Sequence, residues 1–367
     1  MENNKITKIE AIFFILIVMV NRIILNLPFS IIEVTKSGSP INLIYIGIIG
    51  LFIVIIINKL LKKFPSSDII DVSEYLGGNL LKIFISIVYI AFLFLSLYIT
   101  LVEFSNLLEI IYFKKSPKIF ILMFFILAIL ISNLTGFRSI IKTICAIVPF
   151  TILSILITFF GATDNFEIYN FTPLLGDGVY QVFVVGLQNL FAFSIINLFV
   201  FFKPLLKNTY EFSKVTISSY LIAWLLLFIT IISLMNAFPI TQDSTAINYL
   251  YLLSKKLNLG NFIQRIDALF IFLWIISIFS YLSIVTFVIN ILFKKITNCE
   301  NKQMFTYFSS PILLSLCLIP TNTAIIRFLD TVVYKYSIII LILVTSIFIL
   351  LFANLKFWLS SRRKNET

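Results

Sequence analysis

Long, nearly uncharged apolar runs recur along the whole chain, and they constrain its fold more than any other feature. A helix that crosses a bilayer needs about 20 mostly apolar residues, and runs of this length are separated here by short polar segments. The chain is 60% hydrophobic and 12% charged, so a soluble domain of this composition would lack the polar groups to cover its surface. The sequence therefore predicts an integral membrane protein with many spans.

Each run is predicted to be an α-helix, because a backbone in lipid must satisfy its own hydrogen bonds. The short alternating strands of a membrane barrel are not evident in the sequence. The first run follows a polar start and is too long for a signal peptide. About ten spans are expected, at residues 10–32, 42–61, 80–112, 118–134, 139–161, 180–203, 214–236, 265–293, 304–320 and 333–359.

Basic residues between the runs set the predicted orientation. With a cytoplasmic N-terminus, the inside segments hold roughly twice as many lysines and arginines as the outside segments, as the positive-inside rule requires. Both termini are therefore predicted to be cytoplasmic. Helices 1–5 (about 10–161) and 6–10 (about 180–359) then form two halves of a single transmembrane domain, 1–367. An odd number of helices per half makes any repeat inverted, as in many secondary transporters.

Several functional classes find no support in the sequence. The net charge of +11 is spread in small clusters between apolar runs, which is typical of membrane loops rather than of a nucleic-acid surface. There is no histidine, and the three cysteines are far apart without metal-site or disulfide spacing. No nucleotide loop or hydrolase motif is present. We therefore expect no enzyme, no cofactor and no metal.

Polar residues interrupt the first predicted helix at its centre. Asn21, Arg22, Asn26 and Pro28 break an otherwise apolar run, and the proline removes a backbone hydrogen bond and loosens the helix near Ile24. Inverted-repeat transporters bind substrate where the first helix of each half is broken. A functional break is thus one interpretation, and a simple proline kink with hydrogen-bonded asparagines is the other.

Arg22 is the most informative single residue, because a charge inside the membrane is costly unless it is paired or hydrated. Glu103 on the third helix is the expected partner, and Glu109 is a poorer one. The sequence leaves two roles open for Arg22. It is either half of a structural ion pair or a direct ligand for an anionic group.

Helices 6 and 8 carry the remaining polar candidates. Ser194 and Asn197 lie three residues apart on one face of helix 6, which Pro204 ends. Helix 8 carries the hydroxyls of Ser277, Ser280, Tyr281, Ser283 and Thr286. These groups either line a ligand site or form the hydrogen bonds that commonly join membrane helices.

At these residues the chain resembles the B subunit of spore nutrient-germinant receptors, the GerAB-type family of the amino acid–polyamine–organocation transporter superfamily. The resemblance covers nearly the whole chain. It is carried by KFPSSDIIDVSEYLGG, by Asn-Leu-Pro in helix 1, by NFTPLLGDG before helix 6, by FAFSIINLFVFFKPLLKN ending helix 6, and by FIQRIDALFIFLWIISIF opening helix 8.

The resemblance implies an all-α fold of ten helices like that of the leucine transporter, with a nutrient, usually an amino acid, bound at the membrane midplane between helices 1, 3, 6 and 8. It implies a place in the spore inner membrane beside a larger A subunit and a lipoprotein C subunit. The expected ligand-binding residues are Asn21, Arg22, Ile23, Ile99, Phe193, Ser194 and Tyr281, with Glu103, Pro28 and Asn197 as structural or intramembrane polar positions.

Two departures from the family pattern affect the expected pocket. Asn21, Arg22 and Ile23 stand where the family usually has small, glycine-rich residues, and Ile195 and Asn197 stand where it often has glycine and then glutamate. The pocket is therefore expected to differ from that of an alanine-sensing member. A nutrient-sensing subunit remains the leading hypothesis, an amino acid permease is the alternative, and a scaffold without ligand is the third.

Overall fold

The computed structural model describes residues 5–365 except 26, 66, 162–167, 239–247, 257–265, 298–303 and 320–322. Within these ranges all regular elements are helices, and the one extended pairing is an isolated bridge between Ile6 and Leu206. Eight helices of the described chain are long and apolar enough to cross a membrane. The prediction of an all-α, multi-pass membrane protein is confirmed.

The elements follow the predicted spans with a few changes at their ends. The α-helices are α1 (Lys8–Ile24), α2 (Leu27–Thr35), α3 (Ser39–Leu61), α4 (Ile69–Ile111), α5 (Lys118–Thr135), α6 (Phe137–Gly161), α7 (Val179–Phe183), α8 (Ile196–Phe202), α9 (Phe212–Ala237), α10 (Tyr249–Lys256), α11 (Ile266–Thr297), α12 (Met304–Leu318), α13 (Thr323–Phe328), α14 (Lys335–Leu343) and α15 (Leu350–Asn365). A 3-10 helix, η5 (Val185–Phe193), joins α7 to α8, and two π-helical segments, η8 (Leu329–Tyr334) and η9 (Val344–Ile349), join α13, α14 and α15.

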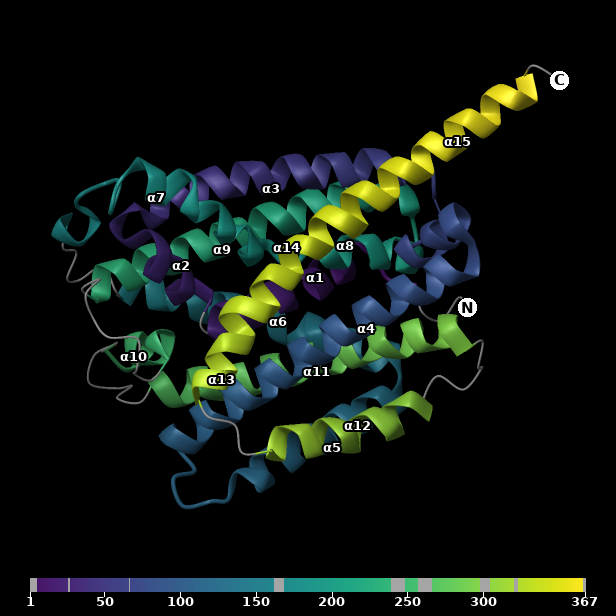
Figure 1. Cartoon of the computed structure of the whole chain (residues 1–367). Helices are drawn as coiled ribbons and strands as arrows, with labels where there is room; N and C mark the ends of the chain where they lie inside the picture. The colour runs from purple at the N-terminus through teal and green to yellow at the C-terminus, as the bar shows by residue number, and fades with distance from the viewer. Residues whose placement is uncertain are drawn as a thin grey trace.

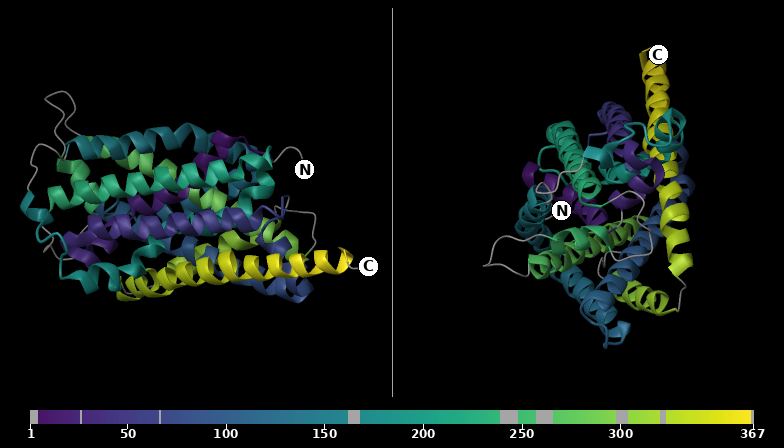
Figure 2. Two further views of the ribbon diagram at one scale, coloured as in Figure 1. Left: turned by 90° about the horizontal axis from the view of Figure 1, so that it is seen from above. Right: turned by 90° about the vertical axis from the view of Figure 1, so that its left-hand side faces the viewer.

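Most of the long helices run side by side along one axis, and α1 is enclosed among the others (Figure 1). The beginning of α1 and the end of α15 lie at the same end of the bundle (Figure 2), as an even number of passes requires. We call this the terminal end, and the other the distal end. The chain from α13 to α15 is tilted and extends past the bundle at the terminal end (Figure 1). The inverted repeat of two halves stays a prediction.

The first predicted helix is broken next to its proline. Helix α1 ends at Ile24 and α2 begins at Leu27. Pro28 has no N–H to offer the carbonyl of Ile24, so the regular ladder cannot pass this point. The side-chain amide of Asn248, just before α10, donates to the carbonyls of Ile24 and Leu25 at 2.5 and 2.8 Å. An outer connection therefore supplies the hydrogen bonds that the break removes.

The sixth predicted helix is broken without a proline at the break. It consists of α7, the 3-10 helix η5, a turn at residues 194–195 and α8, and such a long 3-10 stretch is uncommon. Asn42 of α3 fastens it, because its amide donates to the carbonyl of Val182 at 2.7 Å and accepts from Asn189 at 2.9 Å. Gly186 lets this contact form, since a Cβ there would lie 2.2 Å from Asn42. Both breaks are thus held by asparagine side chains of other elements.

Candidate ligand-binding site

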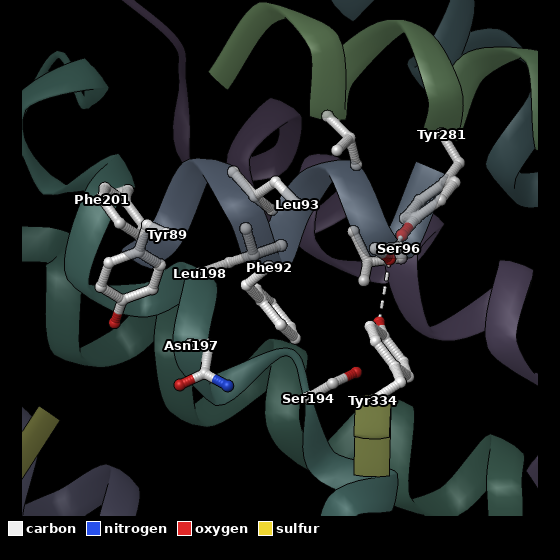
Figure 3. A pocket seen from close by; sticks show the side chains of 12 residues that line it. Tyr89, Phe92, Leu93, Ser96, Ser194, Asn197, Leu198, Phe201, Tyr281 and Tyr334 are labelled. Atoms are coloured by element: carbon white, nitrogen blue, oxygen red, sulfur yellow. Dashed lines mark hydrogen bonds between the residues drawn. The ribbon is translucent and has the colours of Figure 1, made fainter. Parts of the chain in front are cut away.

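A small cavity lies where the two broken helices meet α4, α11 and η8. Its volume is about 20 Å³, which is little more than one water molecule needs. Its lining is mostly apolar and includes several aromatic rings (Figure 3). The residues around it are Val18, Tyr89, Phe92, Leu93, Ser96, Ser194, Asn197, Leu198, Phe201, Tyr281, Val285 and Tyr334.

A hydroxyl cluster forms one side of the cavity. Ser96 of α4 lies within hydrogen-bond distance of the hydroxyls of Tyr281, at 2.6 Å, and Tyr334, at 2.9 Å. Figure 3 shows Ser96 between these two tyrosines, with Ser194 and Asn197 on the broken sixth helix below. The ring of Tyr334 stacks on Phe92 with centroids 5.3 Å apart. Ser96 therefore links three helices through its hydroxyl contacts. A shift of any one of these helices would move side chains that line the cavity.

Arg22 contacts the same wall from α1. Its Nη2 lies 3.0 Å from Oδ1 of Asp330, both side chains are largely buried, and the guanidinium lies 4.7 Å from the centre of the Tyr334 ring. The expected pairing of Arg22 with Glu103 is therefore wrong. The reason is that the tenth helix begins at Thr323, ten residues before the predicted start at 333, so Asp330 is helical and reaches Arg22.

The π-helical segments explain how the tenth helix presents its polar groups. Asp330 and Tyr334 both belong to η8, and Thr345 belongs to η9, where its hydroxyl meets that of Tyr89. A π-segment inserts an extra residue into a helix and is frequent at functional sites. Here each segment turns a polar side chain toward α1 or α4.

The structure brings together some of the predicted site residues. Ser194, Asn197 and Tyr281 line the cavity, and Arg22 lies over the Tyr334 ring that closes it. The amide of Asn197 also donates to the carbonyl of Ile338 at 3.2 Å. Asn21 is fully buried, and neither polar atom of its side chain has a hydrogen-bond partner among the described residues.

Other predicted positions lie away from the cavity. Ile23 and Ile99 are fully buried in the apolar core and are not part of the cavity lining. The ring of Phe193 packs on Tyr220 of α9, with centroids 4.9 Å apart, and is not part of that lining either. Pro28 is buried at the beginning of α2, where it defines the break.

Four site residues were not identified from the sequence. Ser96 and Tyr89 lie inside a long apolar run, and single hydroxyls of this kind are common in membrane helices. Asp330 precedes the predicted start of the tenth helix at 333, and Tyr334 lies one residue inside it. Asp330 could have been found, because an acid close to an apolar span deserves the same attention as Arg22.

The cavity lining combines polar and aromatic side chains. It includes hydroxyl and amide groups and several aromatic rings, and the Arg22–Asp330 pair lies next to it. Across the part of the chain that the structure describes, no three His, Cys, Asp or Glu side chains converge as metal ligands. In this conformation the cavity is too small for an amino acid, so a ligand of that size must widen it.

Broken helices around a small cavity define a transporter-like membrane protein of many helices. Comparison with known proteins identifies its family. A family model described as spore germination protein matches residues 5–326, so the chain belongs to the spore germination protein family.

One curated relative was matched in part. The spore germination protein YndE of Bacillus subtilis (strain 168) is 29% identical to this chain over 181 residues, which are 49% of the chain and 50% of YndE. The chain thus spans about half the length of this relative in the match. The predicted family resemblance is confirmed by the family model.

Proposed function

We propose that the protein is the membrane subunit of a nutrient germinant receptor, which binds a small nutrient, such as an amino acid, and thereby triggers spore germination. Membership of the spore germination protein family supports a role in germination. We further propose the spore inner membrane as its location, cytoplasmic termini, and a larger A subunit and a lipoprotein C subunit as partners. No catalytic role is proposed.

One observation carries this proposal: the cavity lies between two broken helices, and Asn197 in its lining has unused hydrogen-bonding capacity. The side-chain oxygen of Asn197 is buried without a partner in the described structure, and so are both polar atoms of Asn21, which is not part of the cavity lining. Buried groups of this kind are costly and usually have a partner. A nutrient with amino and carboxyl groups would supply such partners.

The small volume of the cavity fits a sensor that changes state on binding. An amino acid cannot enter without separating the aromatic walls that Phe92 and Tyr334 form. Ser96 is hydrogen-bonded to both Tyr334 and Tyr281. Widening the cavity would therefore shift α4, α11 and the tenth helix together. A ligand that binds only the widened state shifts the population toward it.

A binding assay on the purified full chain tests the proposal. Thermal unfolding is measured in lipid nanodiscs with each of the common amino acids, and a stabilising nutrient is then compared in Ser194→Leu and Ser315→Leu. Ser194 lines the cavity, whereas Ser315 lies exposed on α12. We expect Ser194→Leu to abolish the stabilisation and Ser315→Leu to retain it. Stabilisation by no nutrient, or equal stabilisation in both variants, would refute the site.

An amino acid permease is the second candidate, because broken helices at a central site are also the architecture of secondary transporters. Uptake of a labelled nutrient into proteoliposomes separates the two functions. A receptor subunit is expected to bind without sustained accumulation, whereas a permease accumulates substrate without partner proteins.

A further inference from the structure

Helices α4 and α11 run antiparallel, and the contact between Ser96 and Tyr281 sets their register beyond the break at Gly77 and Gly78. Near the terminal end, Lys295 of α11 pairs with Asp68 and Asp71 at the start of α4, at 2.6 and 2.5 Å. Farther along, Ser96 of α4 meets Tyr281 of α11 at 2.6 Å. Residue numbers thus rise along α4 as they fall along α11. Residues after Ser96 therefore face residues before Tyr281.

A stripe of polar residues continues from this pair toward the distal end on both helices. Thr100 and Glu103 follow Ser96 by four and seven residues, and Ser277 and Trp274 precede Tyr281 by the same steps. These spacings keep each set on one helix face and advance both by about 10 Å. The two stripes therefore start from the same contact and run toward the same end of the bundle.

These four residues share an unusual property. Thr100 and Ser277 are fully buried and Trp274 is 1% exposed. Thr100 Oγ1, Glu103 Oε2, Ser277 Oγ and Trp274 Nε1 are all buried, and none has a hydrogen-bond partner within the described ranges. Most buried hydroxyls elsewhere in this protein donate to a carbonyl of their own helix, as Thr230 does to Leu226. Four unsatisfied groups on facing stripes point to something that binds between them.

The charged side chains near these stripes are two acids and one base. Tyr334 bonds to Ser96, and Asp330 lies one turn from Tyr334 toward the distal end, at the level of Thr100 and Ser277. Glu103 is within electrostatic reach of both Asp330 and Arg22. Two carboxylates therefore share one guanidinium, which already pairs with Asp330. An ionised Glu103 would therefore leave one negative charge inside the membrane, which is costly unless a proton or a cation neutralises it.

We propose that Glu103, Thr100 and Ser277 form a binding site for a monovalent alkali cation. Hard cations take oxygen ligands, and this site offers one carboxylate and two hydroxyls whose lone pairs are uncommitted. A single positive charge neutralises the excess carboxylate. A proton on Glu103 would also neutralise it but would leave both hydroxyls without a partner, so the cation accounts for more of the observations.

The site is tested on the full chain in lipid nanodiscs, with no nutrient present, so its outcome is independent of the proposed nutrient function. Thermal unfolding is followed while NaCl or KCl replaces N-methyl-D-glucamine chloride at constant ionic strength and pH. We expect a saturable rise in Tm of about 2 °C or more with at least one of the two salts. Glu103→Gln should abolish the rise, and Thr100→Val and Ser277→Ala should each raise the half-saturating concentration by about tenfold or more.

Two matched controls make the same chemical changes elsewhere. Glu109→Gln removes another carboxylate from α4, and Thr230→Val removes a buried hydroxyl from α9, and both should keep the wild-type response. Trp274 gives a second readout, because its fluorescence should change with the same cation and the change should vanish in Trp274→Phe. No cation dependence, or an unchanged response in Glu103→Gln, overturns the proposal. Stability that follows pH but not the cation assigns the charge to a proton and also overturns it.

Discussion

The buried ion pair between Arg22 and Asp330 leads to an asymmetric prediction. Arg22→Met leaves two carboxylates, Asp330 and Glu103, near each other without the guanidinium that attracts both. Asp330→Asn leaves the guanidinium with Glu103 still within electrostatic reach. The arginine is therefore the group whose loss should cost more, although both substitutions remove one member of the same pair.

The expected losses in the free energy of unfolding follow from the burial of the pair. The side chains of Arg22 and Asp330 are 4% and 11% exposed, and their atoms are 3.0 Å apart. Removing one partner of such a pair costs about 3–5 kcal/mol, and we expect this cost in full for Arg22→Met. For Asp330→Asn, the amide still accepts one hydrogen bond and Glu103 replaces part of the lost charge. We expect about 1–3 kcal/mol, the cost of an impaired hydrogen bond.

Unfolding of the purified variants in one detergent or nanodisc composition measures both effects. Adding Glu103→Gln to Asp330→Asn should cost more than the two single changes together, because the arginine then has no carboxylate near it. Lys82→Met is the control, since its partner Glu74 is solvent-exposed. It should cost less than about 1 kcal/mol. The reasoning is refuted if Asp330→Asn is as costly as Arg22→Met, or if the double variant is additive.

Three further changes test the packing and the helix breaks. Gly47→Ala should destabilise the protein by about 1–3 kcal/mol, measured as a lower Tm, because the new Cβ would lie 2.1 Å from the ring of Trp224. Asn248→Ala should cost about 1–3 kcal/mol in the same assay, because it leaves two carbonyls at the α1 break without their donor. Burial raises the pKa of Asp68 from 3.8 to about 6 despite the attraction of Lys295. The folded state then holds this proton more tightly than the unfolded state, so stability should fall as pH rises from about 4 to 6. Asp68→Asn keeps the helix cap and should flatten the profile of Tm against pH over that range.

The sequence predicted the broad architecture because lipid allows few alternatives. A long apolar run in a bilayer must be helical, so the positions of most spans followed from hydropathy alone. The break after Ile24 followed from Pro28, because proline lacks the N–H that the ladder requires. These parts of the structure depend on local chemistry, which a single sequence displays directly.

The pairing of charges could not be predicted in the same way. Glu103 and Asp330 are both acids near an apolar span, and choosing between them as the partner of Arg22 requires the rotation of each helix. The π-segment at Leu329–Tyr334 changes that rotation by an extra residue. The break in the sixth helix was likewise expected by analogy with transporters, although the 3-10 geometry of Val185–Phe193 depends on Asn42 in another helix. The geometry of the site therefore depends on contacts between segments that are distant in the sequence.

The two helix breaks differ in what they offer a ligand, and this difference bears on the proposed function. At the first break, Asn248 already donates to the carbonyls of Ile24 and Leu25, so an ammonium group could use them only by displacing that amide. At the second break, Asn197 lines the cavity with its side-chain oxygen unsatisfied among the described contacts. A nutrient entering from this side needs no prior loss of a protein hydrogen bond there. If the protein has the proposed function, we therefore expect the sixth helix to make the first contact with the nutrient. Displacement of Asn248, which would release α10 from the first helix, would follow only for ligands that carry an ammonium group.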